Sequence, residues 1–235
     1  MPLRFSSSIL TATATATTFS NPTQSTGSAV TTVAVSPFLG GGNSYNFSSS
    51  VDSWISFPGS QDWAVGTGDF TLEWFGYQTN TTQFQRVFSV GDYPNIKIGV
   101  SIESSTFYYW ANNSFRYSSA GATSVNTWYH WAVVRASGTT RIYRDGSLRG
   151  TSFADTNNIT ENATSLYIGN TNTPATNAAW VGYITNFRWV KGLAVYTGNF
   201  TVPTSALTAT ASSNPYGGSN TLAIGSGYTK LLIVP

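Results

Sequence analysis

Nine carboxylates could supply acid and base chemistry in this chain, namely Asp52, Asp62, Asp69, Glu73, Asp92, Glu103, Asp145, Asp155 and Glu161. Only Asp69 and Glu73 fall close together on one predicted strand, and at about 3.3 Å per residue they lie roughly 13 Å apart. Hydrolysis of a glycosidic bond needs two carboxyl groups about 5 Å or about 6.5–9.5 Å apart. The spacing predicts that the chain is not an enzyme, although acids from different strands could still meet in space.

His130 is the only histidine, so a serine nucleophile that needs a histidine partner would have to use it. It lies between Trp128 and Trp131 in a predicted strand, where a packed, hydrogen-bonded ring is expected rather than a catalytic base. The chain contains no cysteine, and with one histidine it lacks the usual ligands of zinc. These residues alone therefore assign no cofactor.

Aromatic rings beside amides suit a neutral carbohydrate, because a flat apolar face and a few directed hydrogen bonds hold a sugar. Tyr108 and Trp110 with Asn112 and Asn113 form one such group, and Trp180 follows a loop rich in asparagine and threonine. We predict that these five residues bind carbohydrate. The alternative is that the rings belong to the core and that the two asparagines make a turn.

The rest of the chain is organised around residues 128–146. Residues 128–135 are dense in aromatic and β-branched side chains, Ser137-Gly138 breaks the run, and residues 139–143 continue as a second strand. Asp145-Gly146 then supplies a tight turn. Both faces of the first strand are largely apolar, which predicts a hairpin in the middle of a sheet.

Short runs of alternating apolar and polar residues follow one another with almost no helical periodicity. This pattern predicts an all-β fold, an antiparallel β-sandwich in one domain over residues 41–235. Its last strand is expected near residues 230–234, beside the strand at 45–47. In the strand at 180–190, Tyr183, Phe187 and Trp189 are predicted to share one face.

Residues 1–40 contain few large apolar groups and include the repeat TATATAT at 11–17. A segment with so little surface to bury cannot offset the entropy that it loses on ordering. We interpret it as an extended N-terminal arm, which would order only against a neighbour. The alternative is a disordered leader.

Only 9% of the residues are charged, the formal net charge is +2, and the basic residues are spread along the chain. Because no basic stripe could follow a phosphate backbone, nucleic acid is not expected as a partner. The N-terminus has no continuous apolar region, and no run reaches membrane-spanning length. The sequence thus predicts neither a signal peptide nor membrane insertion.

Four segments, in their order and spacing, resemble the laminin G-like, concanavalin A-like lectin/glucanase superfamily. They are DFTLEW at 69–74, WYHWAVVR at 128–135 with its return YRDG at 143–146, LYIG at 166–169, and residues 182–196. The resemblance implies a jelly-roll β-sandwich. Domains with this fold often hold Ca²⁺ at a rim, which makes Asp92, Asp145 and Asp155 candidate calcium ligands. Each of these aspartates has the alternative role of capping a turn.

The segment KGLAVYTGNFTVP at 191–203 resembles domains common in virion proteins of tailed phages, including capsid decorations and tail fibres. The resemblance implies a structural or decoration protein, assembled in the host cytoplasm and located on the virion surface, and the spacing of the carboxylates predicts that it is non-enzymatic. Its lectin-like domain would serve adhesion or assembly. Its partners would be glycans and, through the arm, other virion proteins or copies of itself. Two alternatives stay open: a carbohydrate-binding adhesion module that acts independently of a particle, and a glycan hydrolase.

Overall fold

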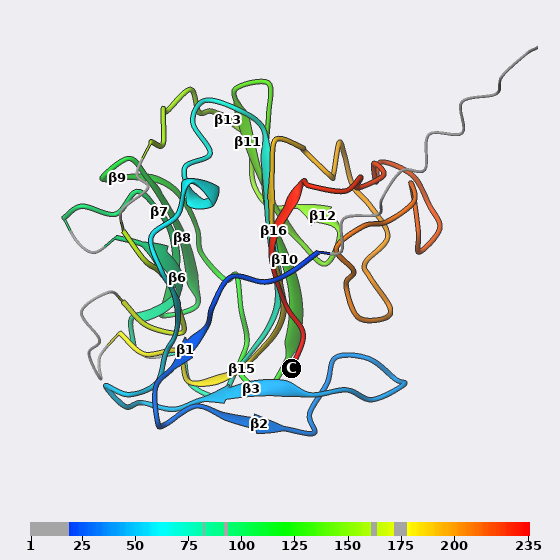
Figure 1. Ribbon diagram of the computed structural model, residues 1–235. Coiled ribbons are helices and arrows are strands. Elements are labelled where there is room, and N and C mark those ends of the chain that lie inside the picture. Colours follow the sequence, from blue (N-terminus) through cyan, green and yellow to red (C-terminus); the bar gives the residue numbers. More distant parts are fainter. Residues whose placement is uncertain (1–18, 82, 92–93, 161–163, 172–177) are drawn as a thin grey trace, which may run out of the picture.

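The computed structural model of the chain describes residues 19–235 except 82, 92–93, 161–163 and 172–177. These residues form two antiparallel sheets that pack face to face (Figure 1). The one helical element in the described ranges is a single 3₁₀ turn, η1 (Gln61–Trp63). The predicted all-β jelly-roll sandwich is therefore confirmed.

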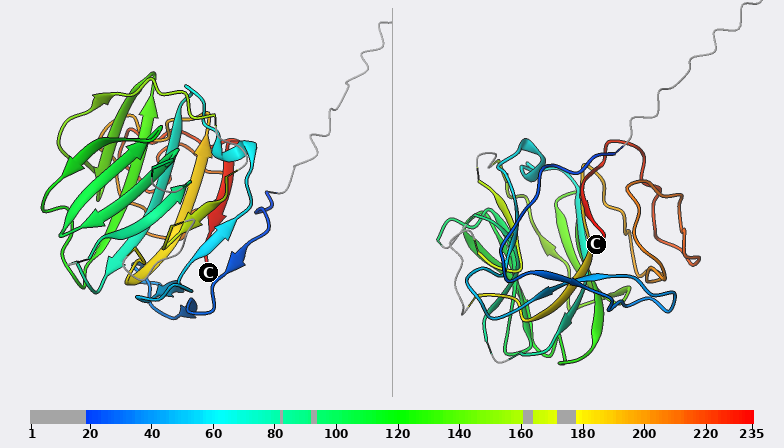
Figure 2. Two further views of the ribbon diagram at one scale, coloured as in Figure 1. Left: turned by 90° about the vertical axis from the view of Figure 1, so that its left-hand side faces the viewer. Right: turned by 60° about the horizontal axis from the view of Figure 1, so that its bottom comes forward.

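Seven strands make the first sheet, which we call sheet A and which faces the viewer in the left view of Figure 2. Their spatial order is β1 (Ser25–Thr26), β4 (Ile55–Phe57), β14 (Leu166–Ile168), β6 (Gln85–Val90), β7 (Ile98–Glu103), β8 (Thr106–Ala111) and β9 (Ser114–Ser119).

Nine strands make the second sheet, sheet B. Its main path runs through β12 (Ser147–Leu148), β11 (Thr139–Arg144), β10 (Trp128–Ala136), β5 (Phe70–Gln78), β15 (Gly182–Lys191), β3 (Ser44–Phe47) and β2 (Thr31–Val33). Beside this path, β13 (Phe153–Ala154) pairs with β11, and β16 (Thr229–Ile233) pairs with β15.

The hairpin of β10 and β11 lies where the sequence predicts it. Ser137 and Gly138 make its turn with φ of 47° and 72°, and β10 pairs on its other side with β5. Trp131 and Val133 point into the space between the sheets, while Ala132 and Val134 belong to a second apolar cluster on the opposite face. Both faces of β10 are apolar, and the fold therefore buries both of them.

Aromatic rings fill the space between the sheets. Trp74 of β5 lies at its centre, with ring centroids 5.7 Å from Phe88 and 6.5 Å from Phe107. Trp131 stacks on Phe107 at 4.7 Å. Since each buried ring removes roughly 150–250 Å² from water, these contacts stabilise the fold in a chain that has no cysteine.

The second apolar cluster lies on the outer face of sheet B, the face turned away from sheet A. There the segment 192–225, orange to red in Figures 1 and 2, packs against the sheet through Val195, Tyr196, Phe200 and Ile224. The turn residue Gly146 has φ 74°, and its carbonyl oxygen accepts a hydrogen bond from Phe200 N at 2.9 Å. A Cβ there would clash with the Phe200 carbonyl, so this close approach requires glycine.

The last strand, β16, does not lie beside β3 as predicted. Both strands pair with the same side of β15: Gly182–Ile184 pairs with β3, and Phe187–Val190 pairs with β16. A bulge between Thr185 and Arg188 separates the two stretches, with Asn186 at φ 53°. β3 and β16 therefore lie end to end along β15, on either side of the bulge.

The same bulge overturns the predicted facing of β15. In a regular strand, alternation would place Tyr183, Phe187 and Trp189 on one face. The extra residue in the bulge shifts this alternation by one position. Phe187 and Trp189 point into the core with Ile184, whereas Tyr183 contacts Tyr77 on the outer face of sheet B.

Residues 19–40, assigned to the arm from the sequence, lie against this chain's own sandwich. β1 extends the edge of sheet A along β4, and β2 extends sheet B along β3. Asn21 both donates to Leu232 O at 2.6 Å and accepts from Leu232 N at 2.9 Å. Backbone pairing at sheet edges, together with the packing of Val30 and Phe38 on the sandwich, thus orders a segment of this composition. Residues 1–18 of the predicted arm lie outside the described residues.

Among the described residues, no helix has the length and apolar character needed to cross a bilayer.

Candidate functional site

The outer face of sheet B carries an acid held in a buried network beneath the segment 192–225. Glu73 of β5 is fully buried. Its Oε1 accepts from Arg188 Nε at 2.8 Å and Nη2 at 2.6 Å. Its Oε2 accepts from Tyr196 OH at 2.7 Å and lies 3.1 Å from His130 Nε2. Both carboxylate oxygens are therefore fully engaged.

The electrostatics of this network keep Glu73 ionised. Burial by itself raises its pKa, but the Arg188 charge and the contacts with His130 and Tyr196 outweigh burial and lower the pKa from 4.5 to about 2. Burial and the Glu73 charge raise the pKa of Tyr196 well above 10, so its phenol stays protonated and donates. A general acid needs a raised pKa and access to substrate, and Glu73 has neither.

Acid should therefore destabilise the protein through Glu73. Its folded pKa of about 2 lies below the ordinary 4.5, so its contribution is complete above pH 4.5 and is lost as the pH falls toward 2. At about 1.4 kcal/mol per pH unit, the loss is on the order of 3 kcal/mol. Urea unfolding between pH 6 and 2 measures it. A free energy of unfolding that stays flat across this window would contradict the assignment.

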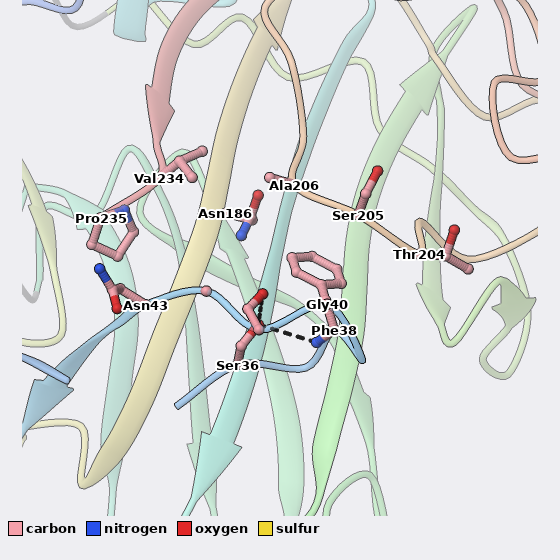
Figure 3. Close-up of a pocket in the computed structure, with 12 residues that line it drawn as sticks. Ser36, Phe38, Gly40, Asn43, Asn186, Thr204, Ser205, Ala206, Val234 and Pro235 are labelled. Atoms are coloured by element: carbon pink, nitrogen blue, oxygen red, sulfur yellow. Dashed lines mark hydrogen bonds between the residues drawn. The ribbon is translucent and has the colours of Figure 1, made fainter. Parts of the chain in front are cut away.

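Beside this network, two hollows open on the same face, and we call them together the cleft. One lies beside Phe75, Trp128 and His130, with a volume of about 270 Å³. The other, drawn in Figure 3, lies between residues 36–43 and residues 204–206 and measures about 250 Å³. Phe38 and Thr204 line both. Figure 3 shows the Phe38 ring beside Asn186 and Ser205 in this second hollow.

Aromatic rings continue from the cleft across the sheet. Trp128, Tyr77 and Tyr183 lie side by side on β10, β5 and β15 in one register row. The ring centroids of Tyr77 lie 5.4 Å from Trp128 and 5.3 Å from Tyr183. All three side chains are half-buried, and Asn46 of β3 continues the row opposite Tyr183. This row offers a wide apolar face with an amide at its end.

The structure brings four of the five predicted carbohydrate ligands together, on the outer face of sheet A. Tyr108 and Trp110 are half-buried on β8, and Asn112 and Asn113 form the turn to β9 with φ of 49° and 63°. Phe115, which sequence reasoning missed, joins them with its ring 5.8 Å from each of the two. Their role in binding stays a prediction, and the turn geometry also satisfies the alternative for the asparagines.

Trp180 does not belong to a ligand site. Its side chain is 1% exposed and lies in the core cluster between the sheets. Its backbone N donates to Gly169 O at 2.7 Å. The prediction was wrong because proximity to a polar loop says nothing about the direction of a side chain.

The structure separates the predicted calcium ligands that it describes. Asp155 is 1% exposed, and its oxygens accept from Thr140 Oγ1 at 2.9 Å and Asn157 Nδ2 at 2.6 Å. Asp145 lines the cleft and accepts from His130 N at 2.9 Å, while Asp92 lies outside the described residues. No group of three acidic or histidine side chains suited to a metal occurs in the described part of the chain. Calcium binding stays a prediction, because the described residues do not bring these aspartates together into one site.

Sequence reasoning also missed the outer face of sheet B, although part of the signal was present. Alternation along residues 69–77 places Phe75 and Tyr77 on the face of Glu73, and alternation in β10 places Trp128 with His130. Phe38 carries no such signal, because it lies in the loop between β2 and β3.

Comparisons with known proteins agree with this architecture. The family model described as the concanavalin A-like lectin/glucanases superfamily matches residues 47–193. The enzymatically active domain of tailspike protein 2 from bacteriophage CBA120 is 14% identical, with a TM-score of 0.63, and the match covers 95% of this chain and 34% of that one. The binding domain of botulinum neurotoxin serotype G is 16% identical, with a TM-score of 0.52, over 73% of this chain and 44% of the other.

The solved structures are similar to the chain in fold alone, and the chain spans less than half the length of either. A search of curated protein sequences finds no match. The family model, in contrast, covers more than half of the 235 residues, and the strands it spans form the sandwich described above. The chain therefore belongs to the concanavalin A-like lectin/glucanases superfamily.

Proposed function

We propose that the chain is a carbohydrate-binding module of a tailed-phage virion protein, exposed on the particle for adhesion, and that it has no enzymatic activity. The observation that carries the proposal is the cleft on sheet B with the adjoining row of Trp128, Tyr77 and Tyr183. Rings that are half-buried on an open face can stack on sugar rings, and nearby hydroxyl and amide groups can direct hydrogen bonds.

The acids on this face support a binding role over hydrolysis. Asp145 is the only acidic side chain among the described residues that line the two hollows. Glu73 lies beneath the segment 192–225 with both oxygens engaged. A glycosidase mechanism with two carboxylates therefore lacks its second group in the cleft.

The virion part of the proposal rests on the resemblance of residues 191–203 to domains of tailed-phage virion proteins. The likeness to the phage tailspike agrees with it at the level of fold. In this proposal the module binds glycans, and residues before the sandwich link it to other virion proteins or to further copies of itself. The alternative is an adhesion module that acts independently of a particle.

Replacing Trp128 with alanine is expected to weaken glycan binding on the order of tenfold or more, because a stacking surface next to the cleft is lost. A glycan array followed by calorimetry on the strongest neutral binder measures the effect. Trp110→Ala is the matched control, since it removes a half-buried tryptophan from sheet A. Loss of binding in the control alone would transfer the site to Tyr108, Trp110 and the Asn112-Asn113 turn.

Light scattering on the full chain and on the chain without residues 1–18 tests the assembly part. This deletion spares β1 and β2, which belong to the sandwich. We expect a defined oligomer that dissociates to monomers when the segment is removed. Monomers in both samples would contradict self-association through the arm and favour the independent module.

A further inference from the structure

His130 has one ring nitrogen that the described residues leave without a partner. The residue is 1% exposed, its Nε2 faces Glu73, and its Nδ1 makes no hydrogen bond within the described part of the chain. Buried polar groups in folded proteins almost always have a partner. The His130 side chain has no exposed surface, but the residue lines the cleft together with Trp128 and Asp145, so a further partner for Nδ1 would have to come from a molecule packed against it there.

The network beneath the cleft determines what kind of partner Nδ1 needs. Glu73 is ionised and can only accept, so the proton of the neutral imidazole resides on Nε2, which donates to Glu73. Nδ1 then carries a lone pair and is an acceptor. Arg188 pairs with the other oxygen of Glu73 at 2.6 Å, which fixes the carboxylate that faces Nε2.

A second acceptor lies next to it. The Asp145 side chain is 45% exposed; its Oδ1 accepts from the backbone N of His130, and its Oδ2 lies 3.7 Å from Arg144 Nε. His130 and Asp145 both line this hollow, and the Asp145 oxygens keep lone pairs that these two contacts do not use. A ligand that hydrogen-bonds to both His130 Nδ1 and the Asp145 carboxylate must carry two hydrogen-bond donors close to each other.

We propose that the cleft beside His130 binds a pair of neighbouring hydroxyl groups of a neutral saccharide, one donating to His130 Nδ1 and the other to the Asp145 carboxylate. This inference rests on the proposed function and narrows its ligand class. The walls formed by Phe38, Phe75 and Trp128 suit the apolar face of a sugar ring. A volume of about 270 Å³ is near the lower end for ligand sites, which favours one sugar unit over several.

The same two acceptors disfavour acidic sugars. A carboxylate or sulfate in the cleft would face the Asp145 carboxylate and an imidazole lone pair. Arg144 pairs with Asp145 at 3.7 Å but does not line this hollow, and no other Lys or Arg does among the described residues. Like charges that meet at a desolvated site oppose binding. His130 is thus a specificity-determining residue, and Glu73 is a positioning residue that holds its tautomer.

Because His130 is the only histidine, the imidazole nitrogens of the ¹⁵N-labelled full chain give one set of NMR signals. Oligosaccharides of glucose, mannose and galactose are titrated against polygalacturonate as the acidic probe. We expect the tautomer protonated at Nε2, binding of a neutral probe, and a shift of Nδ1 toward its hydrogen-bonded value at saturation. Polygalacturonate is expected to leave the signals unchanged.

Asp145→Asn is expected to weaken the neutral probe about tenfold, because the amide retains its backbone contact but presents one acceptor fewer. Asp69→Asn is the matched control, since Asp69 accepts from Ser137 N at 2.8 Å at the other end of the hairpin. A tautomer protonated at Nδ1, preference for polygalacturonate, or neutral binding that leaves Nδ1 unmoved would overturn the inference. In the last case the proposed function survives, whereas the absence of any binding by the neutral probes contradicts both.

Discussion

Replacing Glu73 with glutamine is expected to lower the free energy of unfolding by about 3–5 kcal/mol, measured by urea denaturation at pH 7. The change leaves the Arg188 guanidinium buried opposite a neutral amide, which also cannot accept from Arg188, Tyr196 and His130 as a carboxylate does. Breaking one side of a buried ion pair costs far more than breaking a surface pair, because the remaining charge has no water to solvate it.

Glu103→Gln provides the matched comparison, because Glu103 ends β7 with an exposed side chain. We expect a change within about 0.5 kcal/mol. The Glu73 variant should also lose the acid-dependent decrease in stability between pH 4.5 and 2, because the titrating group is gone. Equal effects of the two substitutions would show that the network contributes little net stability.

Trp180→Ala is expected to cost about 3–5 kcal/mol of stability while leaving glycan binding per folded molecule unchanged. Its ring lies in the core cluster and packs closely on Gly76 of β5: a Cβ added to that glycine would lie only 3.3 Å from Trp180 Cζ2. Removing it leaves a cavity between the sheets that the surrounding rings cannot fill without moving. Urea denaturation measures the stability, and calorimetry on the folded fraction measures binding.

The comparison with Trp128→Ala distinguishes the two tryptophans. Trp128 is half-buried on the outer face. Compared with Trp180→Ala, Trp128→Ala should therefore lower the free energy of unfolding less and weaken glycan binding more. The reverse outcome, with Trp180→Ala stable and unable to bind glycan, would restore the sequence-based site and contradict the burial seen here. Preparing both variants in parallel also guards against attributing a folding defect to the ligand site.

Several features of this protein follow from local sequence. The strands of the central hairpin alternate between two faces with a period of two, and the pairs Ser137-Gly138 and Asp145-Gly146 adopt the positive φ that tight turns need. Neighbouring residues alone set these properties, because side-chain alternation and turn geometry involve only a few consecutive dihedrals. The all-β class and the position of β10 within the sheet could therefore be predicted.

Features that depend on a single inserted residue could not be predicted. The bulge between Thr185 and Arg188 reverses the facing of Tyr183 relative to Phe187, and one side of β15 is divided around it between two partner strands. No strong sequence signal marks such a bulge, since asparagine with positive φ is common in loops as well. Tyr183 was assigned to the face of Phe187 for this reason.

The candidate site was decided by tertiary structure. Glu73, His130, Arg188 and Tyr196 meet although up to 123 residues separate them along the chain, and their contact requires the register of three strands and the return of the segment 192–225. The cleft likewise needs Phe38, from a segment read as an arm, to pack against Phe75 at 5.1 Å. Residue types alone showed which groups could bind a sugar or hold a charge. Which of them share one desolvated surface depended on pairing between distant strands, because burial and electrostatic coupling act through space and not along the sequence.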